Sequence, residues 1–328
     1  MTTVHTGLLD ELEQTLDELR IDHARKSVTV GDETISQDSQ TRLGQELGGV
    51  LYRHWHSGSG RRPDDRDPRR DYDFEDLLRE ATPHRTSKTP AIVKSALLDG
   101  PFGQHALFDV GRVRLRIPGA EVLSPLPEIG TRTTLDLPSI RPALSPGFFL
   151  VDGSAGGHAS GKHVLRLYLH VDEASTAPAV WQAVLTHLES QGVTYRAKVL
   201  ARAGWYPRRD AIVVYLTEES WHTVDGVVDA VRHLPGLNPE HSVMTRPIAD
   251  GVAFGWEPRD ARIGWGRMSL GQHRTAVIAH AVAAHLFQGV DLPTAVADAF
   301  IEANVDPRAP HRNNDSPDWA PTTSGAVS

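Results

Sequence analysis

The feature that most constrains the fold is a pair of apolar segments joined by a short turn, TYRAKVLARAGWYPRRDAIVVYL at residues 194–216. Both segments have the composition of half-buried strands, and the short link indicates that they are neighbours. A third segment, HVLRLYLHV at residues 163–171, alternates along its whole length. Its leucines share one face, so Arg166, Tyr168 and His170 share the other. These segments predict a sheet with one apolar face and one polar face.

Segments with helical spacing precede, separate and follow these strands. They lie at residues 6–19, 39–56, 71–81, 177–190, 223–234, 271–289 and 292–305. Further strand patterns occur at residues 112–117, 131–137, 148–152 and 242–248. Because helices and strands mix without a regular β-α-β order, we predict an α+β fold. Its antiparallel or mixed sheet would be flanked by helices and follow a mostly helical N-terminal segment.

Changes in composition divide the chain into five parts. They are a helical segment at 1–56, a flexible charged insert at 57–73, an α/β region at 74–152, a second α/β region at 153–305 and a disordered tail at 306–328. The insert, rich in Gly, Pro and paired charges, reads as a solvated loop, with a peptide-contacting arm as the alternative. The tail is rich in Pro, Asn and Ser and is expected to fray.

Composition excludes several classes of function. The 328 residues carry a net charge of -8, which disfavours a duplex nucleic acid partner. The absence of cysteine removes disulfides, thiolate metal sites and a cysteine nucleophile. No apolar run reaches transmembrane length, and no signal sequence precedes the first helix. We therefore expect a cytoplasmic protein that binds neither nucleic acid nor membrane.

Cationic side chains gather on the polar face of the predicted sheet. Arg196 and Lys198 share one face of their strand, and a neighbouring strand would add Arg166, Tyr168 and His170. This face is either the ordinary wet side of a half-exposed sheet or a cationic groove. In the second case an anion would have to offset the repulsion between the cations, so the pattern favours an acidic ligand.

Other charged residues stand at the ends of predicted elements. Arg208 and Arg209 precede a strand. Asp210, which follows them, would either form a simple turn ion pair with one of these arginines or join the anion-binding site. Arg246 lies near a strand end. The stretch from Ser269 to Arg274 opens a long helix, whose N-terminus favours an anion, although Ser269 as the N-cap would explain this stretch alone. The scattered histidines lack the spacing of a metal site.

Four motifs resemble, in the same order, those of the HopA-type type III effector family. They are RLYLHV, YRAKVL followed by YPRRDAIVVYL, SVMTRPIADGVAFGWEP and SLGQHRTAVIAHAV. The resemblance extends from about His163 to the end of the long helix, and it is weaker in LGGVLYRHWHSG and SPGFFLVDG. It implies that residues 153–305 form a HopA-like catalytic domain.

Some members of this family act beside a kinase-like protein in class V lanthipeptide and thioamitide biosynthesis. The kinase phosphorylates Ser or Thr of a ribosomal precursor peptide. The resemblance implies a phosphoserine/phosphothreonine lyase that eliminates this phosphate and leaves dehydroalanine or dehydrobutyrine. It implies two partners, the phosphorylated precursor peptide and the kinase-like protein, in a heteromeric complex. It implies no cofactor and no metal, since β-elimination needs neither.

Phosphothreonine lyases of another family, which use a lysine base and a histidine acid, supply roles by analogy. Lys198 would be the base, since neighbouring arginines favour a neutral lysine. His273 or His170 would be the acid, with His273 preferred, and Tyr168 would orient the peptide or assist proton transfer. The phosphate clamp would consist of Arg166, Arg209, Arg246 and Arg274. Residues placed near this site in secondary roles are Arg196, Arg208, Asp210 and Ser269.

A second function fits the same residues. The protein would then be a non-catalytic scaffold that binds the phosphopeptide or activates the kinase, and Lys198 distinguishes the two functions. In either case we expect the N-terminal part up to Asp152 to bind the leader peptide or the kinase. An edge strand at 112–117 or 131–137 would add a peptide strand to its sheet.

Overall fold

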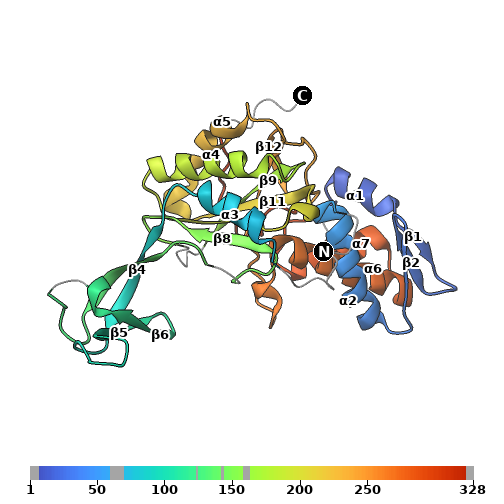
Figure 1. The fold of residues 1–328 in the computed structure, drawn as a ribbon. Coiled ribbons are helices and arrows are strands. Elements are labelled where there is room, and N and C mark those ends of the chain that lie inside the picture. Colours follow the sequence, from blue (N-terminus) through green and yellow to red (C-terminus); the bar gives the residue numbers. More distant parts are fainter. Residues whose placement is uncertain (1–6, 60–69, 123–124, 142–143, 158–162, 323–328) are drawn as a thin grey trace.

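The structure is a computed structural model that describes residues 7–59, 70–122, 125–141, 144–157 and 163–322. Three antiparallel sheets and a set of helices make up this part of the chain (Figure 1), which confirms the predicted α+β fold. In these ranges, no helix is both long enough and apolar enough to cross a membrane.

The largest sheet has six strands in the order β12-β13-β9-β11-β10-β8. Their bounds are β8 Phe148–Asp152, β9 Leu165–Val171, β10 Tyr195–Leu200, β11 Arg208–Leu216, β12 Arg246–Ala249 and β13 Val252–Trp256. The predicted hairpin is formed by β10 and β11, which pair antiparallel. The predicted third strand is β9, which lies between β11 and β13. The sequence-based expectation of a shared sheet is thus confirmed.

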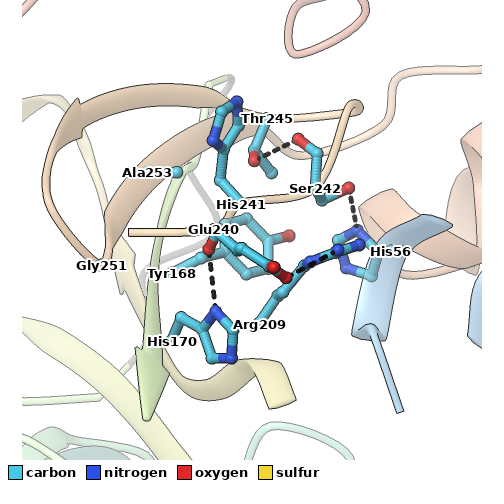
Figure 2. A pocket seen from close by; sticks show the side chains of 10 residues that line it. All are labelled: His56, Tyr168, His170, Arg209, Glu240, His241, Ser242, Thr245, Gly251 and Ala253. Carbon is cyan, nitrogen blue, oxygen red and sulfur yellow. Dashed lines mark hydrogen bonds and ion pairs between the residues drawn. The ribbon is translucent and has the colours of Figure 1, made fainter. Parts of the chain in front are cut away.

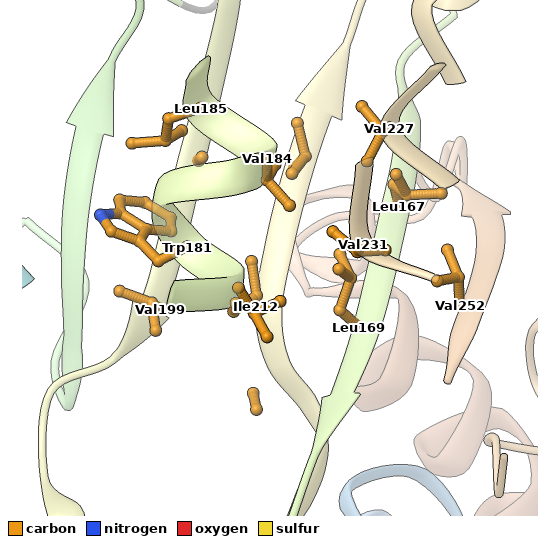
Figure 3. Close-up of a cluster of buried hydrophobic side chains, with 14 of the residues drawn as sticks. Leu167, Leu169, Trp181, Val184, Leu185, Val199, Ile212, Val227, Val231 and Val252 are labelled. Atoms are coloured by element: carbon orange, nitrogen blue, oxygen red, sulfur yellow. The ribbon is translucent and has the colours of Figure 1, made fainter. Parts of the chain in front are cut away.

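Two helices cover the apolar face of the six-stranded sheet. They are α4 (Ala177–Ser190), which has the bounds predicted from the sequence, and α5 (Val224–Val231), which follows the 3-10 turn η4 (Glu218–Thr223). Figure 3 shows Leu167 and Leu169 beneath these helices, and both leucines are completely buried. Each fully buried side chain of this kind contributes about 1.5–3 kcal/mol to folding.

A second core joins the N-terminal segment to the C-terminal helices. Its helices are α1 (Asp10–Asp17), α2 (Gln40–Leu51), α6 (Leu270–Gln288) and α7 (Leu292–Glu302). Helix α2 continues directly into a π-helical turn, η1 (Tyr52–Ser57). A small sheet of β1 (Arg20–Asp22), β2 (Ser27–Val30) and β3 (Glu33–Ser36) completes this region. Sequence patterns did not predict these strands, which are too short to show clear alternation.

The region before β8 contains a separate four-stranded sheet. Its order is β6-β5-β4-β7, with bounds β4 Thr86–Val93, β5 His105–Val110, β6 Val113–Pro118 and β7 Arg132–Pro138. This sheet projects from the body at the lower left of Figure 1 and has a small core of its own. Helix α3 (Tyr72–Glu80) precedes it. The remaining 3-10 turns are η2 (Gly119–Glu121), η3 (Ala203–Trp205) and η5 (Trp265–Arg267).

The expected disordered tail from Asp306 requires a correction, because residues 306–322 pack on the body of the protein. Trp319 contacts the ring of Trp221 with a centroid distance of 5.9 Å, and the Thr322 amide donates to Asp225. The polar composition of the tail predicts fraying, but the packing of the partly buried Trp319 against the main core outweighs it. The charged insert falls mostly outside the described residues, as do residues 323–328.

Candidate active site

The register of the six-stranded sheet brings the predicted polar residues to one face. Lys198 pairs with Val213, which pairs in turn with Tyr168. The next row across the sheet pairs Arg196 with Tyr215, and Tyr215 with Arg166. Residues directly opposite each other in antiparallel strands point to the same side. The side chains of these two rows therefore share one surface. Lys198 and Tyr168 are two strands apart across the sheet, which separates their backbones by about 10 Å.

Lys198 is half-buried and lies on an aromatic ring. Its Nζ is 3.8 Å from the ring centroid of Phe148 on β8, and the Arg208 guanidinium lies 5.8 Å from the same ring. Among the described residues, no carboxylate comes within ion-pair distance of this Nζ. The lysine charge still acts on the pKa of both Asp210 and His56. Lys198 thus has a neighbouring cation, and no anionic side chain of the described segments is bound to it.

Beside Lys198, Arg208 and Asp210 form a buried ion pair. Arg208 Nε and Nη2 donate to the two carboxylate oxygens of Asp210, each at 2.7 Å. The Tyr52 hydroxyl, from η1, donates to Asp210 at 2.9 Å and accepts from Arg208 at 3.2 Å. Burial alone would raise the pKa of Asp210, but the guanidinium lowers it below its usual value. Asp210 therefore forms the turn ion pair that was one of its two expected roles, and this pair lies next to Lys198.

Arg166 occupies the other side of the same face. Its Nε donates to Glu257, and its guanidinium stacks 4.9 Å from the ring centroid of Tyr215. Only 6% of Arg166 is exposed. Glu257 accepts from Nε alone, so the Nη groups can donate to an acceptor that enters this face.

The polar face is covered, contrary to the picture of a wet sheet surface. The turn η1 and the first turn of α6 lie over it: the His56 ring stacks edge-on against Tyr168 at 5.5 Å, and Leu270 packs on Tyr168 and Val213. A Cβ on Gly271 would lie 2.0 Å from His56, so only glycine allows these two elements to approach this closely. The Tyr168 hydroxyl is buried and finds no hydrogen-bond partner in the described ranges. Burial also raises its pKa.

His170 and Arg209 line a small cavity next to Tyr168 (Figure 2). The cavity measures about 10 Å³, room for about one water molecule. His170 Nδ1 donates to the Glu240 carbonyl at 2.8 Å, and burial lowers the pKa of this histidine. Arg209 donates to the carbonyl of His54 at 3.2 Å and to the Glu240 carboxylate at 3.1 Å. His170 therefore joins β9 to the loop at Glu240, and Arg209 joins β11 to this loop and to η1.

His273 and Arg274 lie inside the protein and are fully buried. His273 Nε2 donates to Asp260 at 2.9 Å, while Nδ1 accepts from Arg274 at 2.7 Å. Burial, together with the Arg274 charge, lowers the pKa of His273 to about 4. Arg274 also donates to the Pro310 carbonyl at 2.9 Å and to Asn313 at 2.9 Å. Arg274 thus holds the C-terminal segment and His273 supports it from Asp260, while the Arg274 charge also interacts with Tyr168 and Arg166 of the polar face.

The remaining predicted residues occupy other places. Arg246 is exposed and pairs across the strands with Phe254, which belongs to the apolar face, so the structure does not bring it to Lys198. Arg196 donates to Asp152 at 2.7 Å. Ser269 forms a capping box with Gln272 at the start of α6, which bears out its alternative role as N-cap.

Several residues of this site were not predicted from the sequence. Tyr52, His56 and Phe148 approach Lys198 from η1 and β8, and Glu257 follows β13. The signal for Tyr52, His56 and Phe148 was the weak resemblance in LGGVLYRHWHSG and SPGFFLVDG, whereas Glu257 lies in the motif SVMTRPIADGVAFGWEP. Among all the residues that the structure describes, no group of three or more His, Asp or Glu residues is arranged to hold a metal ion.

In chemical terms, this face offers an amine and two guanidinium groups around a buried hydroxyl. Lys198 is partly open to solvent, whereas Arg166, Arg208 and Tyr168 are buried. An amine without a bound carboxylate can accept a proton once it is neutral, and guanidinium groups can stabilise a phosphate or carboxylate. The arrangement suits proton abstraction next to an anionic group.

The solved structures that resemble the chain include two effector proteins. An effector protein from Pseudomonas syringae pv. tomato strain DC3000 matches 51% of this chain and 62% of its own, with 14% identity and a TM-score of 0.40. An effector protein from Pseudomonas syringae pv. syringae strain 61 matches 90% of this chain and 99% of its own, with 13% identity and a TM-score of 0.44. The chain thus spans about three-fifths of the first of these proteins.

No curated protein sequence matches the chain. The model of the HopA1 effector protein family matches residues 139–312 of this protein, which is more than half of the 328-residue chain. This range contains the six-stranded sheet, its covering helices and α6. The chain belongs to the HopA1 effector protein family.

Proposed function

We propose that this protein is a phosphoserine/phosphothreonine lyase. It acts in the cytoplasm on a ribosomal precursor peptide that a kinase-like partner has phosphorylated, in a pathway of the lanthipeptide type. The observation that carries the proposal is the position of Lys198, which lies with Arg208 at the ring of Phe148 and has no carboxylate of a described residue within ion-pair distance. Family membership agrees with the proposal but does not by itself specify a reaction.

The reaction is a β-elimination. Neutral Lys198 removes the proton from Cα of the phosphorylated residue, and the electrons of that bond form the Cα=Cβ double bond. The Cβ–O bond breaks, and its electrons leave with the phosphate oxygen. A proton donor then neutralises the leaving phosphate. The products are dehydroalanine or dehydrobutyrine in the peptide, free phosphate and protonated Lys198.

Arg166 and Arg208 hold the phosphate in this mechanism. Each already uses part of its guanidinium for an internal carboxylate, Glu257 or Asp210, and this contact fixes its orientation. The remaining N–H groups of such a fork can donate to phosphate oxygens, and their charge stabilises the leaving group.

Tyr168 is the proton donor in our proposal. Its hydroxyl lies on the Lys198 face and stays protonated at neutral pH, because burial raises its pKa. His273, preferred from the sequence, already uses both ring nitrogens within the protein. Since the Tyr168 hydroxyl is buried under η1 and α6, the substrate must displace part of this cover to reach it.

The test compares the wild type with Lys198→Arg on a phosphothreonine peptide, read by mass spectrometry and by binding. Arginine keeps the positive charge but cannot act as a base near neutral pH. We expect the elimination rate to fall about 10²- to 10⁴-fold while the phosphopeptide still binds. Lys26→Arg is the matched control, since Lys26 also lies on an aromatic ring, 5.0 Å from the centroid of Phe287.

The alternative function is a non-catalytic phosphopeptide-binding scaffold or activator of the kinase. In that case the wild type, with the kinase-like partner present, would bind the phosphopeptide and leave its phosphate in place. Full elimination by Lys198→Arg would instead show that another residue is the base. Either result would overturn the mechanism with Lys198 as the base.

A further inference from the structure

We propose that the four-stranded sheet binds an acidic, extended segment of the peptide substrate as an additional strand along the outer edge of β6. This inference rests on the proposed function for the identity of the substrate. It concerns a part of the peptide that lies outside the phosphorylated residue. The surface also lies outside the Lys198 face.

The strand β6 is an edge strand whose outward backbone groups can be assigned. It pairs with β5 on one side, and no described strand pairs with its other side. The Gly119 amide donates to the Gln104 carbonyl at 2.7 Å in the same register. Because hydrogen-bonded pairs alternate in an antiparallel ladder, the N–H and C=O groups of Arg114 and Arg116 point outward. An edge of this kind is a template for a further strand.

The charge of the adjoining sheet face selects an acidic strand. The register places Arg114, Arg116 and Arg132 on one face. The basic residues of this face are Lys88, Lys94, Arg114, Arg116 and Arg132, all exposed, and its acidic residues are Asp109 and Asp136. The whole chain carries a net charge of -8, so this basic face stands out against an acidic protein. Acidic side chains at alternate positions of an added strand would meet it.

The opposite face of β6 supplies an apolar contact. Val113 is 59% exposed at one end of the strand, whereas Ile117 is buried in the small core. An added strand with apolar residues between its acidic ones would cover Val113 while its carboxylates meet Arg116 and approach Arg114, which already donates to Asp109 at 2.8 Å. A pattern of alternating acidic and apolar residues fits both faces of the edge.

The position of this sheet connects it to the proposed active site. After β7, the Ser139 carbonyl accepts from the Asp152 amide, and Ile140 bridges to Val151 of β8. β8 is the strand that lies beside Lys198 of β10. A peptide held on β6 is thereby tethered to the catalytic part of the same molecule, which raises the effective concentration of its phosphorylated residue.

The test measures binding of a fluorescein-labelled peptide of alternating Glu and Val to the full chain by anisotropy, with a Lys-Val peptide as the comparison. We expect Arg116→Glu and Arg116→Pro each to weaken binding of the Glu-Val peptide at least about tenfold. The proline removes an outward N–H and leaves the β5 ladder intact. Arg232→Glu, at an exposed arginine that follows α5, is the charge control, and circular dichroism checks the fold of each variant.

Three results would overturn the inference. The first is equal binding of the Lys-Val peptide, and the second is an equal loss of affinity in Arg232→Glu. The third is weakening by Arg116→Glu but not by Arg116→Pro, which would mean attraction by charge without strand addition. The probe contains no phosphate, so this measurement does not depend on elimination. The assay with the phosphothreonine peptide decides the proposed function separately.

Discussion

At the central strand β9, the two faces of the six-stranded sheet are both buried, but for different physical reasons. On one face, Leu167 and Leu169 lie under α4 and α5 with no exposed surface. On the other face, Arg166 and Tyr168 are only 6% and 4% exposed, because η1 and α6 cover them. The alternation along β9 therefore assigns residues to faces, but it does not tell which face meets solvent.

The difference lies in what each face requires. An apolar face needs only to leave water, and any well-packed side chain of the right volume satisfies it. A covered polar face must provide a hydrogen-bond or ion-pair partner for every polar or charged group that it buries. Arg208 meets this requirement with Asp210, and Arg166 meets it with Glu257. The Tyr168 hydroxyl does not meet it with any described residue, and we regard this as the point where the substrate completes the face.

A substitution on the apolar face should cause the largest loss of stability. Leu167→Ala leaves a cavity between β9 and the covering helices, and we expect it to lower the free energy of unfolding by about 4 kcal/mol. Urea denaturation measures this loss. The molecules that remain folded should still bind the phosphopeptide as the wild type does, because Leu167 points away from Lys198.

Leu77→Ala is the matched control for that variant, since Leu77 on α3 is 51% exposed. Its unfolding free energy should stay within about 0.5 kcal/mol of the wild type. A large loss in Leu77→Ala, or a small one in Leu167→Ala, would contradict the assignment of the main core to this face.

A smaller loss of stability, with a loss of function, should come from the polar face. Asp210→Asn leaves the buried Arg208 without its carboxylate, and we expect about 3 kcal/mol of destabilisation in the same denaturation measurement. Phosphopeptide binding should weaken as well, since Arg208 loses the partner that orients it. The control is Asp229→Asn at the exposed pair with Arg232, where about 0–1 kcal/mol is at stake. Equal losses in the two variants would remove the distinction between buried and exposed pairs.

Local patterns in the sequence were sufficient for most of the catalytic half. The period-2 alternation of β9 and β10 placed Arg166, Tyr168 and Lys198 on one face correctly, because strand geometry fixes it without tertiary information. Helix α4 and the end of α6 at Gly289 also followed from turn and cap residues.

Long-range contacts could not be predicted in this way. The cover of the polar face brings His56 next to Tyr168, more than a hundred residues away in the chain. Arg274 looked available for phosphate in the sequence, yet its hydrogen bonds go to Pro310 and Asn313 in a tail expected to be disordered. Such pairings depend on how separate segments pack, and neither composition nor periodicity records them.

The smallest of the expected effects is a pH dependence of stability that comes from the buried polar face. His56 is buried on the polar face, and burial, together with the charges of Arg208, Arg166 and Lys198, lowers its pKa from 6.5 to about 4 against the opposing charge of Asp210. Between these values the unfolded chain binds a proton that the folded protein does not bind, so stability falls as the pH falls. From pH 7 to pH 5 this histidine should account for about 2 kcal/mol of lost stability.

His56→Gln should therefore lose about 2 kcal/mol less than the wild type between pH 7 and pH 5, measured by urea denaturation at each pH. The lowered pKa of Asp210 has no influence in this window, because a carboxylate of this kind loses its stabilising effect only below the unfolded value of about 3.8. The exposed His233 supplies the control variant His233→Gln, whose profile should follow that of the wild type. If His56→Gln also followed the wild type, protons would reach His56 in the folded state. The cover formed by η1 and α6 would then be open in solution, and the buried polar face would be a surface after all.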